Sequence, residues 1–116
     1  MKIPDWCNYH DQEINIGNSE WSISRLIELS KNFPIMEIPL DHLFVYSTYK
    51  ELSLREMVMH VKAILESNLD FPIILDEDGY ILDGRHRIMK AILNGESTIK
   101  AVRFEENPAP CRTYDP

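Results

Sequence analysis

The residues with the clearest chemical potential are Asp-Gly-Arg-His-Arg at positions 83–87. A short apolar segment that predicts a strand precedes them, and apolar residues recur at helical spacing over 88–92. Arg85, His86 and Arg87 therefore fall in the first turn of a predicted helix, where unpaired N–H groups already carry partial positive charge. Three basic side chains are unfavourable in that field unless an anion lies among them. The pattern therefore predicts a phosphate-binding site at residues 83–87, the step from strand to helix.

Each residue of this step has an expected role. Gly84 allows a ligand to approach the backbone closely. The N–H groups of Gly84 and Arg85 would hold the phosphate, Arg85 and Arg87 would neutralise it, and His86 belongs to the same turn. Helical spacing predicts that both arginines flank the buried stripe and that His86 and Lys90 point away from the core. In the structural alternative, the arginines only pair with nearby acidic residues.

The sequence around the step carries further motifs. They are a Pro-Ile-Ile-Leu strand at 72–75, a hairpin at 76–83, Asn-Gly at 94–95, a strand to 104, and Ile-Pro-Leu-Asp-His-Leu at 38–43. Together, over residues 35–104, they resemble the ParB/sulfiredoxin-like superfamily, and Asp-Gly-Arg-His-Arg is similar to the Asp-Gly-His-His-Arg of free-serine kinases. The resemblance implies a nucleotide ligand, ATP, ADP or CTP, held at this step.

Departures from these relatives narrow the function. Sulfiredoxins place a catalytic cysteine where this chain has Arg85, so their thiolate chemistry is not expected. Partition proteins continue with a helix-turn-helix region, whereas this chain stops shortly after Phe104, so a complete partition protein is not expected. Free-serine kinases carry a glutamate shortly after the first strand. This chain offers Glu51 or Asp41 in that region instead.

The predicted catalytic residues are Asp83, Glu51 and Asp41. Asp83 would accept a proton, hold a magnesium ion or orient Arg87. Two function classes stay open. The chain is either an enzyme, namely a phosphotransferase, nucleotide hydrolase or ParB-like nuclease, or a non-catalytic accessory module of a plasmid or phage system. A carboxylate within reach of the phosphate favours the enzyme.

Composition limits the partners. The formal net charge of −7 argues against coating nucleic acid or a membrane, and it favours a small phosphorylated ligand over sequence-specific DNA. A protein partner or a homodimer stays open. Cys7 and Cys111 lie near opposite ends with no metal-ligand spacing, which gives no indication of a disulfide framework or structural zinc. No apolar run reaches transmembrane length, so a cytoplasmic protein is expected.

The predicted fold class is α/β (α+β): a small ParB/sulfiredoxin-like domain whose mixed sheet is packed by helices, with an extra N-terminal helix. The expected division is an N-terminal extension at 1–34 with one helix from Asn18 or Ser19, the domain at 35–104, and a tail at 105–116. Within the domain, 37–45 predicts an edge strand, because Pro39 interrupts it.

Two local patterns predict elements that support the step. Ser53 begins a capping box, and the apolar spacing after it is typical of a helix packed on a core, with its methionines as core filler. Asp78-Gly79 has the composition of a tight hairpin turn with positive φ angles. The acidic cluster at 76–78 reads as local hydrogen bonding in that turn.

Overall fold

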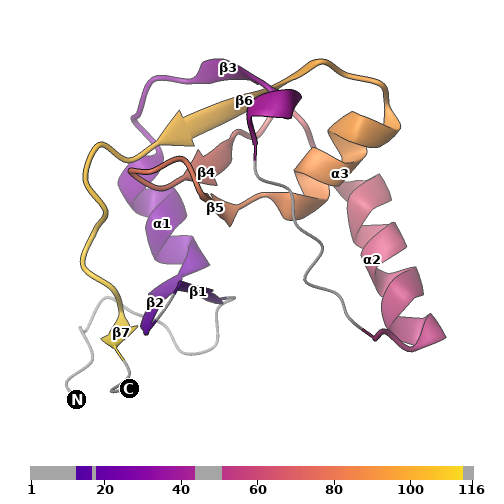
Figure 1. Cartoon of the computed structure of the whole chain (residues 1–116), viewed down its shortest axis with the longest axis horizontal. Helices are drawn as coiled ribbons and strands as arrows, with labels where there is room; N and C mark the ends of the chain where they lie inside the picture. Colours follow the sequence, from indigo (N-terminus) through magenta and orange to yellow (C-terminus); the bar gives the residue numbers. More distant parts are fainter. Residues whose placement is uncertain (1–12, 17, 44–50, 114–116) are drawn as a thin grey trace.

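The computed structural model describes residues 13–16, 18–43 and 51–113, which form a small compact α/β arrangement (Figure 1). In chain order, its elements are β1 (Glu13–Ile16), β2 (Ser19–Ser22), α1 (Ile23–Ser30), β3 (Met36–Pro39), the 3-10 helix η1 (Leu40–His42), α2 (Leu54–Glu66), β4 (Ile73–Leu75), β5 (Ile81–Asp83), α3 (Arg85–Leu93), β6 (Thr98–Arg103) and β7 (Arg112–Thr113). The predicted α/β class, with a mixed sheet and packed helices, is confirmed at this level.

The main sheet has four strands in the order β3-β6-β4-β5. β6 runs parallel to β4, and the other two pairings are antiparallel, so the sheet is mixed. β3 lies at one edge, as Pro39 predicts, but it ends there and gives way to η1 instead of continuing to residue 45. β5 lies at the opposite edge, so the chain enters α3 from the rim of the sheet.

Helices cover both faces of this sheet. Ile73 and Leu75 of β4 belong to a buried cluster with Ile88 and Ala91 of α3. Ile74, between them, belongs to a second cluster with Leu26 of α1. Successive strand residues point to opposite faces, so the apolar run in β4 is buried on both sides and gives three layers, α1, sheet and α3.

A β-bulge changes this alternation in β5. Leu75 pairs with Ile81, but the next residue back, Ile74, pairs with Asp83, so β5 contains one extra residue. Paired residues share a face, and Asp83 therefore lies on the α1 side with Ile74, directly after Leu82, which packs on that same side. A regular register would direct Asp83 toward the α3 face.

A second sheet joins the two ends of the described chain in the order β1-β2-β7. The stretch expected to be a tail contributes β7, and its Cys111 N–H donates to the Glu20 carbonyl at 2.7 Å. The indole of Trp21 donates to the Pro108 carbonyl at 2.9 Å. Residues 19–22 are therefore a strand, and Ser22, rather than Asn18 or Ser19, caps α1 through the Arg25 N–H.

Two further expectations concern Cys111 and the membrane. Cys111 is disulfide-bonded, although nothing in the sequence indicated a disulfide framework, and its sulfur is therefore not available as a nucleophile. The spacing of Cys7 and Cys111 in the sequence could not show this, because a disulfide depends on proximity in space. Within the described ranges, no helix has the length and apolar character needed to span a membrane.

The helix predicted after Ser53 is α2, and its capping box is present. The Ser53 hydroxyl accepts from the Glu56 N–H, and the Glu56 carboxylate accepts from the Ser53 N–H. However, α2 contains no buried residue, and Met57 and Met59 are half exposed. The prediction that these methionines fill the core is therefore wrong, because α2 packs mainly on α3 and leaves its apolar side uncovered.

Candidate functional site

Asp83 and Arg87 form an ion pair at the entrance to α3. The Arg87 guanidinium donates to the Asp83 carboxylate at 2.8 Å, and both side chains are about four-fifths buried, with 20% and 19% exposure. The pair spans one helical turn, because Asp83 ends β5 and Arg87 lies in the first turn of α3. Asp83 therefore orients Arg87, which is one of the roles expected for it.

Gly84 is required by packing as well as by conformation. It precedes α3 with a φ of 114°, in the region that side chains other than glycine rarely adopt. A Cβ atom at this position would lie 2.4 Å from Cγ2 of the buried Ile73 and 3.1 Å from the Arg87 guanidinium. The space beside the Gly84 backbone is thus filled by the protein itself, whereas the sequence suggested close approach of a ligand.

The ion pair lines a pocket of about 460 Å³, here called the Asp83 pocket. Its walls come from α1, the segment after it, the start of β4 and one residue of β6: Ile27, Ser30, Lys31, Phe33, Ile35, Phe71, Pro72, Ile74, Asp83, Arg87 and Val102. Most of these side chains are apolar. Its charged lining residues are Arg87, Lys31 and Asp83; Arg87 pairs with Asp83, and Lys31 pairs with Glu28 outside the pocket, so the pocket combines a mostly apolar wall with two paired cations.

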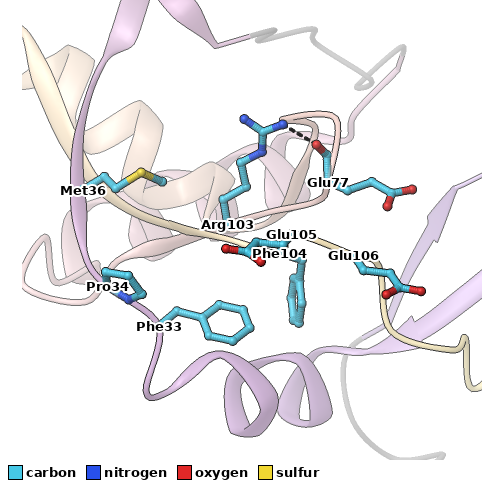
Figure 2. A pocket seen from close by; sticks show the side chains of 8 residues that line it. All are labelled: Phe33, Pro34, Met36, Glu77, Arg103, Phe104, Glu105 and Glu106. Atoms are coloured by element: carbon cyan, nitrogen blue, oxygen red, sulfur yellow. Dashed lines mark hydrogen bonds between the residues drawn. The ribbon is translucent and has the colours of Figure 1, made fainter.

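A second and larger cavity, of about 710 Å³, lies on another side of Phe33 (Figure 2). Figure 2 shows Arg103 donating to the backbone carbonyl of Glu77, with the carboxylates of Glu105 and Glu106 nearby. Three carboxylates and one guanidinium line this cavity, so its net negative charge repels phosphate. The smaller Asp83 pocket is therefore the better candidate for an anionic ligand.

The other basic residues of α3 do not line the Asp83 pocket. Arg85 does not line it and makes no ion pair within the described ranges. His86 meets His60 of α2, with 3.0 Å between the ring nitrogens. Lys90 donates to the last carbonyls of α2, those of Leu65 and Ser67. His86 and Lys90 therefore point away from the buried stripe of α3, as predicted, and they contact α2, which the sequence pattern did not indicate.

Asp41 and Glu51 are not brought to Asp83 by any contact among the described residues. Asp41 is exposed in η1, Glu51 is exposed just before α2, and neither lines the Asp83 pocket. Within the described ranges, no three acidic, histidine or cysteine side chains are grouped to hold a metal ion. Asp83 is engaged by Arg87, so the residues present do not fit a protein-bound magnesium ion.

Sequence reasoning missed most of the pocket wall. Phe71 and Ile35 are exposed to 61% and 58%, yet they border the same pocket from segments far apart in the chain. Lys31, bound at 2.7 Å to Glu28 on the surface, adds a cation from the end of α1. One signal in the sequence could have indicated this wall. Phe71 precedes Pro72 and Ile35 follows Pro34, so two large apolar residues lie beside prolines, outside any helical or strand periodicity.

The His60–His86 contact predicts that stability falls at acidic pH. Burial and the neighbouring His60 lower the pKa of His86, while Asp83 opposes this shift. The unfolded chain therefore takes up a proton at higher pH than the folded one, so stability is full above the ordinary histidine value of about 6.5 and is lost as pH falls below it. We expect the melting temperature to be lower at pH 5.5 than at pH 7.5, by differential scanning calorimetry.

Two histidine variants separate this contact from other titrations. His86→Gln should reduce the pH dependence, because glutamine keeps a hydrogen-bonding group but does not gain a proton in this range. His42→Gln removes an exposed histidine of η1 and should leave the pH dependence as in the parent chain. An unchanged pH dependence in His86→Gln would show that the His60–His86 contact is not its source.

No family model, curated protein or solved structure matches this chain. The resemblance to the ParB/sulfiredoxin-like superfamily stays a hypothesis that rests on the motifs themselves.

Proposed function

We propose that this chain binds a nucleotide or another small phosphorylated ligand in the Asp83 pocket. One observation carries the proposal: Arg87, held by Asp83, lines a pocket whose remaining wall is mostly apolar. A nucleotide joins a flat, weakly polar base to an anionic phosphate, and these two parts match the apolar and the cationic side chains of the lining. The volume of about 460 Å³ lies within the range of small-molecule sites.

The roles of the residues follow from their places. The base would lie against the apolar wall that includes Phe71 and Ile35. The phosphate would lie beside Arg87 and Lys31, the two cations that line the pocket. The superfamily resemblance supports a nucleotide among phosphorylated ligands.

Binding without turnover is the function we favour. Phosphoryl transfer and hydrolysis need a carboxylate or a metal ion to position and activate the attacking group. Asp83 is the one carboxylate that lines the Asp83 pocket among the described residues, and its charge is already neutralised by Arg87. The phosphotransferase, hydrolase and nuclease alternatives would each require Asp83 to leave Arg87. A nucleotide-binding accessory module requires no such change.

Thermal melting with ATP, ADP, CTP and inorganic phosphate, each with and without magnesium, tests this function. At a hundredfold excess over the dissociation constant, a ligand should add about 2.7 kcal/mol of stability, or several degrees in Tm. Arg87→Gln should abolish the shift. Arg103→Gln makes the same charge change in the cavity of Figure 2 and should leave the shift intact.

Two results would contradict the proposal. One is the absence of any shift of the parent chain by nucleotides. The other is a nucleotide shift that survives Arg87→Gln, which would place the ligand elsewhere. Phosphate alone should give a much smaller shift than ATP, because it cannot occupy the apolar wall. An equal shift would reduce the site to an anion site without a base pocket.

A further inference from the structure

The strongest unexplained feature outside the Asp83 pocket is the apolar side of α2. Leu54, Val58, Val61 and Leu65 recur at i, i+4, i+7 and i+11 and form one stripe along the helix. These four side chains, here called the α2 stripe, are between 48% and 82% exposed. A stripe of this kind is normally buried against another element, but nothing in the described chain covers it.

The α2 stripe is large enough to be an interface. Met57 borders it and is 50% exposed. Together the five side chains expose an apolar area on the order of 500 Å², within the range of the largest patch on a typical monomer. Two such patches total on the order of 1,000 Å², about the smallest area expected of a specific interface.

The fold leaves room for a partner on this side. α2 lies at the periphery of the molecule and contacts mainly α3 (Figure 1). That contact uses His60 and the C-terminal carbonyls of α2, which bind His86 and Lys90. The stripe lies on a different side of the helix and is not needed for packing within the chain.

The charges beside the stripe indicate which partner fits. Arg55 lies in the first turn of α2, and Glu66 is its last residue. Both oppose the helix dipole, which favours acidic groups at the N-terminus and basic groups at the C-terminus. At about 100° per residue they lie on the same flank of the stripe, as does Lys62, which is 4.0 Å from Glu66. Within one chain, Lys62 offsets the charge of Glu66, whereas Arg55 makes no ion pair among the described residues.

We infer that α2 pairs with α2 of a second copy of this chain, in antiparallel orientation. Antiparallel packing brings the N-terminal end of each helix beside the C-terminal end of the other. The flank that carries Arg55 and Glu66 then faces the same flank of the second copy. Arg55 of each copy lies opposite Glu66 of the other, so the pairing adds two ion pairs that the single chain lacks. The two stripes bury each other between these pairs.

Other occupants fit the charges less well. In a parallel pair, opposite flanks of the two helices meet, so Arg55 and Glu66 of each copy would face the flank of the partner that carries Met57 and would form no ion pair there. A membrane surface is disfavoured because α2 carries Glu56 and Glu66 against Arg55 and Lys62, and the whole chain has a net charge of −7. Helices that lie on anionic membranes instead carry an excess of basic residues on their polar side.

Sedimentation velocity from micromolar to near-millimolar concentration tests the pairing. The mass should rise from 13.6 kDa toward twice that value as concentration increases. Val61→Glu should weaken dimerisation by about tenfold or more, because it places a charge in the centre of the stripe. Ile92→Glu makes a similar change at a residue of α3 that is 55% exposed and outside the stripe, and it should leave the dimer intact. Circular dichroism confirms that each variant is folded.

Charge exchange tests the orientation. Arg55→Glu and Glu66→Arg should each weaken the homodimer by about tenfold, because each creates two like-charge contacts. The double variant should dimerise as the parent does, and a mixture of the two single variants should form heterodimers. A parent chain that stays monomeric, equal losses in Val61→Glu and Ile92→Glu, or single exchanges without effect would each overturn the proposal.

Discussion

Replacing Gly84 with alanine is expected to lower the free energy of unfolding by roughly 3–5 kcal/mol. The φ of 114° places an alanine in a strained backbone region. The added Cβ would also lie 2.4 Å from Cγ2 of Ile73, a residue of β4 that is fully buried in the cluster with α3. Neither strain can relax locally, because Ile73 has no free space to move into. Urea unfolding measures the loss.

Gly79→Ala and Gly95→Ala separate the two causes. Both glycines have positive φ angles, 87° and 74°, but a Cβ at either position would meet nothing within 4 Å. Each variant should therefore cost about 1–2 kcal/mol, the backbone term alone. If Gly84→Ala costs no more than these two, the contact with Ile73 does not restrict position 84.

The features that the sequence predicted well depend on neighbours in the chain. The Ser53 capping box and the β4–β5 hairpin are each set by a few adjacent residues. The prediction that the acidic residues at 76–78 make local hydrogen bonds is confirmed for Asp76, whose carboxylate accepts from the Asp78 and Tyr80 N–H groups. The predicted positive φ angle is confirmed for Gly79 and is wrong for Asp78.

The features that it missed depend on contacts between distant segments. Apolar spacing predicted α2 but not the exposure of its apolar side, because spacing says which residues form a stripe and not what covers it. The bulge that turns Asp83 toward α1 depends on the register with β4. The same holds for His86 and Lys90, whose partners lie more than twenty residues earlier in α2.

The chemistry of the step was therefore predicted in part. The pattern correctly placed Asp83, Gly84 and Arg87 at a strand-to-helix entrance and allowed Asp83 to orient Arg87. It treated the three basic residues as one cationic group, whereas Arg85, His86 and Arg87 lie in three different surroundings. Consecutive helical residues differ in direction by about 100°, so a run of cations in one turn rarely faces one ligand.

The ion pair gives the second large effect. Arg87→Met should lower the free energy of unfolding by about 2–4 kcal/mol, because it leaves the mostly buried Asp83 carboxylate without its partner. The double variant Asp83→Asn/Arg87→Met should lose clearly less than the sum of the two single variants, since no uncompensated charge remains. Lys31→Met, which breaks the exposed pair with Glu28, should cost far less than Arg87→Met, because solvent screens that pair.

The same double variant separates stability from ligand binding. If Arg87 binds phosphate, the double variant should unfold at nearly the denaturant concentration of Asp83→Asn alone, yet show no nucleotide shift, because the guanidinium is absent. Asp83→Asn should keep binding within several-fold, since Arg87 remains and its charge is then less neutralised. A double variant that still binds nucleotide would reduce Asp83 and Arg87 to a structural pair. Nucleotide turnover in the parent chain that Asp83→Asn removes would instead make Asp83 catalytic and overturn binding without turnover.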